Sequence, residues 1–174
     1  KNASSFSQIP NGVRIYDRIV YKEGVTKEVF WKKLEMEAPF IAKSRKAGQF
    51  VIIQLDADLG ERVPLTIADA NEDEGWIALV VQVVGATTMK LCQKDVGEEI
   101  AGVLGPLGQP SIVNKVNHVV CVCGGIGVAP MYPIAQAFKK AGSRLTVIIG
   151  ARNKDLIVFE DEMREIADEL IITT

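Results

Sequence analysis

The stretch Val119-Val-Cys-Val-Cys-Gly-Gly-Ile-Gly-Val-Ala-Pro-Met-Tyr-Pro133 predicts a strand, a tight turn and a helix in direct succession. An apolar run over residues 119–123 is followed by glycines at 124, 125 and 127. Apolar residues then recur with the i, i+3, i+4, i+7 spacing of one helix face, at Met131, Ile134, Ala135 and Phe138. The pattern is typical of a unit in which a buried strand turns sharply into a helix.

The glycines make this turn a candidate pyrophosphate site. Gly124, Gly125 and Gly127 carry no β-carbon that would keep a phosphate from the backbone, and the helix N-terminus offers unpaired N–H groups to an anion. The third glycine of the dinucleotide fingerprint is replaced by Pro130, which suits the first turn of a helix. A glycine-rich strand-to-helix turn without a ligand is the alternative.

Composition limits the classes of function. A chain of 174 residues, 48% hydrophobic, can hold one domain or two small ones. A net charge of -2 with mixed signs gives no reason to expect nucleic acid, and no apolar run approaches the roughly 20 residues of a membrane span. The three cysteines lack zinc spacing, and Cys121 and Cys123 alternate with valines as small hydrophobes in a strand, which favours a reducing, cytoplasmic setting. We interpret His118 as a surface residue at the entry of that strand.

The first part of the chain has the pattern of a small antiparallel barrel. Short apolar runs, separated by clusters of Gly, Pro, Asp and Asn, occupy residues 14–21, 29–34, 50–55 and 76–84, and one short helix is expected over 87–94. The segment Gly102-Val-Leu-Gly-Pro-Leu-Gly108 is interpreted as a linker because its glycines and proline suit neither element.

The second part alternates strands and helices, which predicts a parallel sheet. The expected elements are strand 118–123, helix 130–141, strand 145–149, helix 159–169 and strand 170–172. Three strands make half of a nucleotide-binding fold, so a truncated domain is expected. The predicted division is a disordered or tag-like segment at 1–12, a barrel domain at 13–109 and the truncated α/β domain at 110–174.

This order of a barrel followed by a glycine-turn α/β unit resembles the ferredoxin-NADP reductase superfamily of flavoproteins. Within it, five motifs look like the small flavin subunit of the NADH-dependent ferredoxin-NADP oxidoreductase, also called the sulfide dehydrogenase β subunit, with the electron-transfer subunit of dihydroorotate dehydrogenase as a near relative. These motifs are Ala47–Phe50, Glu61–Asp69, Gly105–Gly108, Gly150–Arg152 and Val158–Met163. The resemblance implies a Greek-key FAD-binding barrel and an NAD(P)-binding half-domain.

The resemblance also implies site residues. In the motif Arg62-Val63-Pro64-Leu65-Thr66, the arginine would bind the FAD pyrophosphate, aliphatic Pro64 or Leu65 would replace the family's aromatic residue, and the hydroxyl of Thr66 would reach flavin N5 or O4. A solvated surface arginine and an ordinary strand hydroxyl are the alternatives.

A second strand implies further flavin contacts. Val81, Gln82 and Val83 would bind through their backbones, and Gly85 leads to Thr87 or Thr88 at a helix start. An edge strand followed by a Thr-capped helix is the alternative without a ligand.

Arg152 lies at the end of the second parallel strand and would bind the 2′-phosphate of NADP, which favours NADP over NAD. Lys154 is the alternative residue for the same phosphate. The implied function is hydride transfer between NAD(P)H and FAD, then single electrons to an iron–sulfur partner such as ferredoxin or a larger flavin/iron–sulfur subunit. The alternatives are the electron-transfer subunit of a dihydroorotate dehydrogenase and a non-catalytic flavin-holding fragment. The [2Fe-2S] cluster of full-length relatives needs four thiolates, and this chain has three scattered cysteines.

Overall fold

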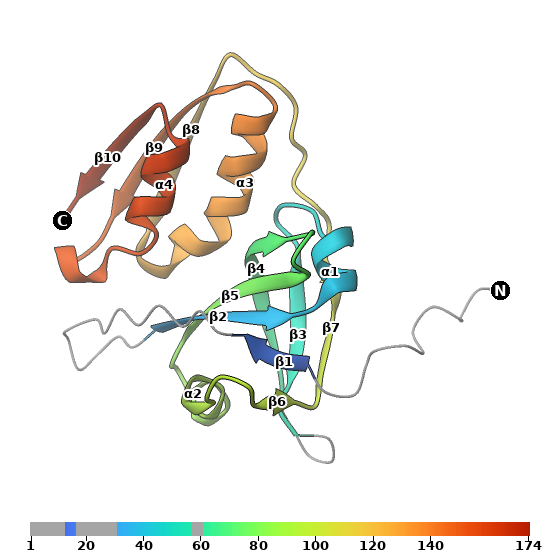
Figure 1. Cartoon of the computed structure of the whole chain (residues 1–174). Helices are drawn as coiled ribbons and strands as arrows, with labels where there is room; N and C mark the ends of the chain where they lie inside the picture. The colour runs from blue at the N-terminus through green and yellow to red at the C-terminus, as the bar shows by residue number, and fades with distance from the viewer. Residues whose placement is uncertain (1–12, 17–30, 57–60) are drawn as a thin grey trace.

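The fold comprises an antiparallel barrel and a three-stranded parallel sheet with two helices (Figure 1). The computed structural model describes residues 13–16, 31–56 and 61–174. The predictions for residues 1–12, and for residues 17–21 and 29–30 of the first two runs, lie outside these residues.

The barrel strands and helices follow the chain in alternating short elements. They are β1 (Val13–Tyr16), β2 (Trp31–Glu37), α1 (Pro39–Ser44), β3 (Phe50–Gln54), β4 (Arg62–Asn71), β5 (Trp76–Gln82), α2 (Ala86–Gln93), β6 (Glu99–Ile100) and β7 (Gly102–Leu107). The sheet order is β6-β1-β2-β5-β4-β3-β7, with every neighbouring pair antiparallel. Consecutive β3, β4 and β5 lie together while β2 lies beside β5, which is a Greek key. Only Ala101 separates β6 from β7, so the two edges of the sheet meet and the sheet curls into a barrel.

The linker prediction for residues 102–108 was wrong. Residues 102–107 form β7, which pairs with β3, and Val103 is buried in the barrel core. Gly105 allows this pairing, because a β-carbon there would lie 2.6 Å from Cγ1 of Val51. Pro106 is tolerated because β7 is an edge strand. The segment can pair as a strand because β3 lies so close to it at Gly105 that a residue without a side chain is needed there.

The barrel core follows from the alternation of side chains along each strand. In β5, Ile77, Leu79 and Val81 point inward and are completely buried. Val51 and Ile53 of β3, two strands away in the sheet, belong to the same buried cluster. The expected helix at 87–94 is confirmed as α2, which closes one end of the core with Leu91 and Cys92.

The parallel unit follows the predicted order of elements. It contains β8 (His118–Gly124), a 3-10 turn η1 (Gly125–Gly127), α3 (Val128–Lys140), β9 (Arg144–Gly150), a 3-10 turn η2 (Lys154–Leu156), α4 (Glu160–Ile166) and β10 (Glu169–Thr173). The sheet order is β10-β9-β8 and both pairs are parallel. The first helix begins at Val128, two residues before the predicted start, so Pro130 lies in its first turn as expected. The second helix is shorter than predicted, because the chain leaves it at Ala167 to enter β10.

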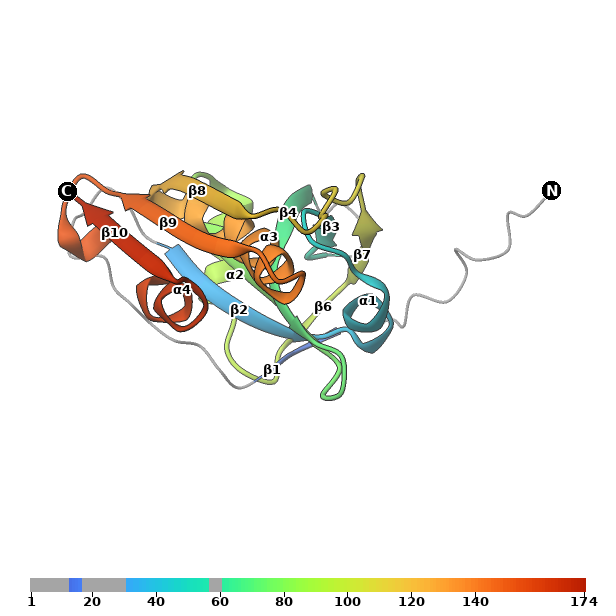
Figure 2. The ribbon, with the colours of Figure 1, turned by 90° about the horizontal axis from the view of Figure 1, so that it is seen from above.

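The parallel sheet has one covered and one bare face. Figure 2 shows α3 and α4 on the same side of the sheet, where Cys121, Leu145 and Val147 are buried. The opposite side presents Val120 and Val122 of β8, which are 52% and 66% exposed. Two right-handed crossovers that run in one direction place both helices on one face, and this explains the difference.

Strand β4 of the barrel contributes side chains to the barrel core and to the core of the parallel unit. The register of β4 against β5 shifts between Ile67 and Asp69, so Ile67 packs in the barrel core while the next residue, Ala68, packs with α3 in the other core. Both residues are 1% exposed. Val80 of β5 packs against the same second core. The outer face of the barrel therefore forms one wall of the parallel unit.

Candidate functional site

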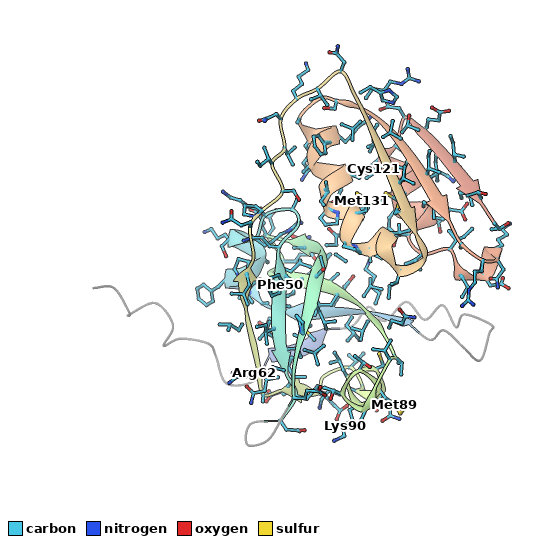
Figure 3. All side chains as sticks on the ribbon, turned by 180° about the vertical axis from the view of Figure 1, so that it is seen from behind. Phe50, Arg62, Met89, Lys90, Cys121 and Met131 are labelled. Carbon is cyan, nitrogen blue, oxygen red and sulfur yellow. The ribbon has the colours of Figure 1, made fainter. Side chains whose placement is uncertain are left out.

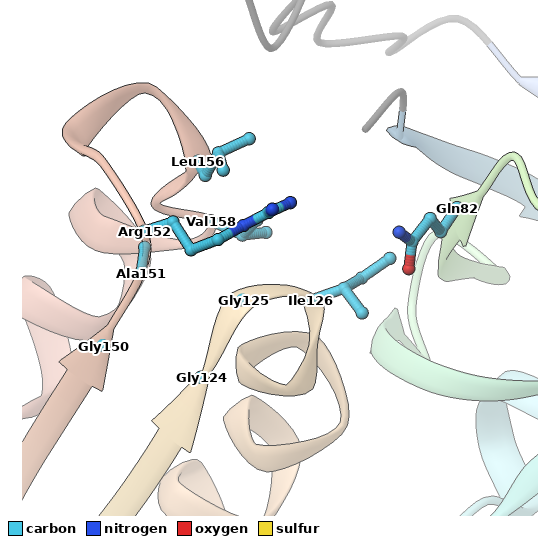
Figure 4. A pocket seen from close by; sticks show the side chains of 9 residues that line it. All are labelled: Gln82, Gly124, Gly125, Ile126, Gly150, Ala151, Arg152, Leu156 and Val158. Carbon is cyan, nitrogen blue, oxygen red and sulfur yellow. The ribbon is translucent and has the colours of Figure 1, made fainter. Parts of the chain in front are cut away.

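A pocket lies where the ends of β8 and β9 meet the barrel (Figure 4). Its cavity measures about 500 Å³, within the range of small-molecule sites. Eight lining residues come from the parallel unit and one from the barrel: Gly124, Gly125, Ile126, Gly150, Ala151, Arg152, Leu156, Val158, and Gln82 of β5. Ligands of open α/β sheets bind at the carboxyl ends of the strands, and this pocket has that position.

The floor of the pocket is bare backbone. Gly124 and Gly150 end neighbouring strands and face each other in register. A β-carbon on Gly124 would lie 3.6 Å from the carbonyl oxygen of Gly150, which is an ordinary contact. Gly125 has a φ of +52°, so the turn itself favours glycine there. Nothing lies within 4 Å of a β-carbon built on Gly125 or Gly127, so the protein leaves this space open.

Of the predicted glycine-turn residues, Gly124 and Gly125 line the pocket. Gly127 is the last residue of the 3-10 turn and Pro130 is the third residue of α3, and neither belongs to the lining. The N-terminus of α3, a helix of 13 residues, follows the glycine turn directly. A phosphate resting on the turn would meet the positive end of this helix.

The wall opposite the barrel is the loop after β9. Arg152 extends its guanidinium over the pocket in Figure 4, with Leu156 above it and Ile126 and Gln82 across the opening. The loop is held by Asn153, whose side chain accepts a hydrogen bond from the backbone N–H of Leu156 at 3.2 Å. Lys154, the rival of Arg152, starts η2 and is not part of the lining.

The predicted flavin motif lies along the outer face of β4. Arg62 and Pro64 are exposed and Thr66 is half-buried, while Val63 and Leu65 alternate with them, and Leu65 packs on the barrel core. The next residue on the outer face, Ala68, contacts the parallel unit. Thr66 is therefore the motif residue closest along the strand to the junction of barrel and parallel unit.

Beside this motif, the described strands β4 and β5 no longer pair with each other. In the described part of the chain, the ladder between β4 and β5 ends at Ile67 and Leu79. Beyond it, residues 62–66 pair with β3 and residues 80–82 pair with β2, so the two strands separate toward α2. Buried or half-buried backbone groups need partners, and a flat ligand with amide-like edges would supply them. Val81 is buried in the core, so only its backbone can face such a ligand.

At the start of α2, Thr87 and Thr88 make different hydrogen bonds and so have different roles. The hydroxyl of Thr88 accepts from the N–H groups of Val84 and Gly85 at 3.0 and 3.1 Å and donates to the carbonyl of Gly85, so it fastens the turn. Thr87 donates its hydroxyl to the carboxylate of Glu61. Glu61 makes this contact from the start of β4, whereas Figure 3 shows Arg62 apart from Met89 and Lys90 of α2. Glu61 was absent from the predicted site although it opens the motif Glu61–Asp69, because its contact with Thr87 joins residues 26 positions apart.

In the described residues, the cysteines are buried in the hydrophobic cores and the histidine contacts a neighbouring strand. Cys92, Cys121 and Cys123 are buried, and none of them forms a disulfide. Burial raises the pKa of Cys123 to about 11, with Cys121 as a smaller cause. His118 bonds Thr146 across β8 and β9 at 2.9 Å. Among residues 13–16, 31–56 and 61–174, no group of three His, Cys, Asp or Glu side chains could hold a metal ion. In the same residues, no helix has the length and apolar character of a membrane span.

Comparisons with known proteins agree with this geometry. Residues 121–170 match the family model of the oxidoreductase NAD-binding domain. A Thermotoga maritima protein, a homologue of the electron transfer subunit of dihydroorotate dehydrogenase B (NAD(+)), is 43% identical over 90% of this chain and 55% of its own length. The electron transfer subunit of that enzyme from Fusobacterium nucleatum is 32% identical over 81% of this chain and 56% of its own length.

Solved structures show the same fold. The NADH-dependent reduced ferredoxin-NADP oxidoreductase, studied for flavin-based electron bifurcation, superposes with a TM-score of 0.81 and 39% identity over 97% of this chain and 58% of that one. A mutant ferredoxin-NADP+ reductase from Plasmodium falciparum has a TM-score of 0.75 at 12% identity, over 94% of this chain and 71% of that one.

The barrel and the parallel unit together thus define a protein with the ferredoxin-NADP reductase fold, as the motifs predicted. Within that class, the chain is similar in sequence to electron transfer subunits of dihydroorotate dehydrogenase B. It spans about half the length of the curated relatives it matches.

Proposed function

We propose that this chain is the flavin- and NAD(P)H-binding part of an electron-transfer oxidoreductase. The observation that carries the proposal is the position of the pocket, which joins the glycine turn of the NAD-binding unit to Gln82 on the outer face of the barrel. A nicotinamide nucleotide whose pyrophosphate rests on Gly124 and Gly125 would extend toward that face.

The nucleotide would be held mainly by backbone. The glycine turn and the N-terminus of α3 suit the pyrophosphate, and Leu156 and Val158 supply an apolar wall. Arg152 reaches over the same cavity and suits the 2′-phosphate of NADP, since a guanidinium binds phosphate in a forked geometry. We therefore infer a preference for NADPH over NADH.

FAD would bind the outer face of the barrel. Residues 62–66 and 81–83 would line its ring system and ribityl chain, and Gly85 and Thr87 would receive the pyrophosphate at the start of α2. The fit rests on the separation of β4 from β5 and on the open space around Gly85, where a β-carbon would meet nothing within 4 Å. When bound, FAD accepts a hydride from NAD(P)H and releases electrons singly.

The protein's own contribution would be positioning. Pro64 offers an apolar surface against a ring, and the hydroxyl of Thr66 would bond the reacting edge of that ring. Ala68 anchors the same strand to α3, so the ring and the nicotinamide would be held by one rigid wall. This wall favours face-to-face contact of the two rings without a general acid or base.

The reduced flavin would deliver its electrons to an iron–sulfur partner, either ferredoxin or a larger flavin/iron–sulfur subunit. The likeness to electron transfer subunits of larger enzymes supports such a partner, and the 43% identity specifically favours a dihydroorotate dehydrogenase-like complex as the second candidate. The proposed division into a barrel domain at 13–109 and a nucleotide domain at 110–174 and a cytoplasmic location complete the proposal.

Anaerobic titration tests the proposed function. The purified protein is reconstituted with FAD, gel-filtered, and its flavin absorbance followed while NADPH or NADH is added. Retained flavin that bleaches on NADPH addition supports the oxidoreductase. Retained flavin that ignores both nucleotides supports a flavin-holding module, and failure to retain FAD refutes the flavin site.

A further inference from the structure

The wall of the nucleotide pocket ends on a residue with an unusual backbone conformation. Phe159 directly follows Val158 of the pocket lining and starts α4 with φ 59° and ψ 30°. Bulky residues rarely adopt this left-handed conformation, and it persists only where the surroundings fix it. Phe159 is 4% exposed, and its ring centroid lies 5.2 Å from that of Tyr132 on α3.

A further contact of Phe159 comes from the barrel. Nζ of Lys33 on β2 lies 5.3 Å from the ring centroid, within the range of a cation–π interaction. The same ammonium lies 3.8 Å from a carboxylate oxygen of Glu162 on α4 and 3.9 Å from one of Glu35 on β2. The Lys33 side chain is 13% exposed, so this charge is largely withdrawn from water and depends on these partners.

The position of Lys33 ties the two sides of the pocket together. Lys33 pairs with Val80 in the register of β2 and β5, and Val80 is two residues from Gln82, the barrel's contribution to the pocket. Lys33 therefore lies on the strand next to the one that carries Gln82. It contacts the opposite wall of the pocket just beyond Val158, at Phe159 and Glu162. The buried carboxylate of Glu35, 6% exposed, and that of Glu162 both approach this one ammonium, so removal of its charge would take an ion-pair partner from each.

We propose that Lys33 is a positioning residue that sets the width of the nucleotide pocket by holding Phe159 and Glu162 against the barrel. The proposal rests on the proposed function for the identity of the ligand, but the contact between Lys33 and the loop can be measured without any ligand. Lys33 touches neither flavin nor nucleotide in this scheme and acts through the loop of residues 151–158.

The experiment compares Lys33→Met with the wild type, with Lys33→Arg as the conservative variant and Lys43→Met, on the exposed surface of α1, as the matched control. Hydrogen exchange of the ligand-free protein is followed in residues 151–163 and in barrel residues 50–54 and 76–79. We expect exchange of 151–163 to accelerate about tenfold in Lys33→Met, with the barrel strands unchanged. Lys33→Arg should restore slow exchange, since a guanidinium keeps the charge and stacks on a ring.

Binding gives the second readout. Calorimetric titration with NADP+ should show about a tenfold higher Kd in Lys33→Met, while FAD retention stays at the wild-type level. Unchanged exchange in 151–163, or equal acceleration in the barrel strands, would overturn the proposal. If the wild type binds NADP+, an equal Kd in Lys33→Met would overturn it as well. If the wild type binds no nucleotide, the proposed function fails by itself, and the exchange rates still decide whether Lys33 fixes the loop.

Discussion

Gly124→Ala should separate stability from nucleotide binding. The site is strand-like, with φ -132°, and the new methyl would lie 3.6 Å from the nearest atom, so the fold can accept it. Replacing glycine where the backbone is compatible stabilises a protein by about 0.4–1 kcal/mol through the unfolded chain, which raises Tm by roughly 1–4 °C at this size. The same methyl lies on the floor of the pocket, where crowding by one methyl costs about 1–3 kcal/mol, which raises Kd by about 5- to 140-fold.

The matched control is Gly102→Ala on β7. A β-carbon there meets nothing within 4 Å, so the fold can accept this methyl too, and the residue is not part of the pocket lining. Differential scanning fluorimetry gives Tm, and calorimetry with NADP+ gives Kd. We expect both variants to gain stability and only Gly124→Ala to lose affinity. Equal affinities in the two variants would refute the assignment of this floor to the nucleotide, and a lower Tm in Gly124→Ala would refute the packing argument.

Four further substitutions test other parts of the site. Arg152→Ala should narrow the preference for NADPH over NADH in the ratio of kcat/KM values, and an unchanged ratio would place the 2′-phosphate elsewhere. Arg62→Ala should lower FAD retention after gel filtration, because a charge-assisted contact contributes roughly 1.5–3 kcal/mol, whereas full retention would leave Arg62 as a surface residue. Glu61→Gln should tighten FAD binding in a fluorescence titration, since its carboxylate holds the hydroxyl of Thr87 and repels a pyrophosphate; weaker binding would make Glu61 a ligand instead. Burial holds the pKa of Cys123 at about 11, so the folded thiol stays protonated while the unfolded one ionises from about pH 9, and stability should fall between pH 9 and 11 by roughly 2–3 kcal/mol. Cys123→Ala should flatten the pH dependence of the urea midpoint between pH 9 and 10, and an identical slope would assign the loss to other groups.

The parallel unit could be predicted because its signals are local. The apolar run of residues 119–123, the glycine turn and the helical spacing after it each depend on a few neighbours in sequence, and their order fixes the sheet. The glycine contacts that line the pocket follow from the same stretch. Boundaries shifted by two or three residues, because helix ends depend on where the chain must turn.

Features that depend on distant partners could not be predicted. Residues 102–107 have the composition of a linker, yet β3 recruits them as an edge strand. Thr87 and Thr88 are indistinguishable in sequence, and only the turn geometry shows that Thr88 fastens the backbone. The contact of Lys33 with Phe159 joins residues 126 positions apart, so no motif could reveal it.

The register shift in β4 has a consequence for how the molecule melts. Ile67 and Ala68 are consecutive, yet each is sealed inside a different hydrophobic cluster. Neither cluster can unfold without removing β4, which contributes to both, from the other cluster. Heat should therefore disrupt both in one cooperative step, with a calorimetric enthalpy equal to the van't Hoff value.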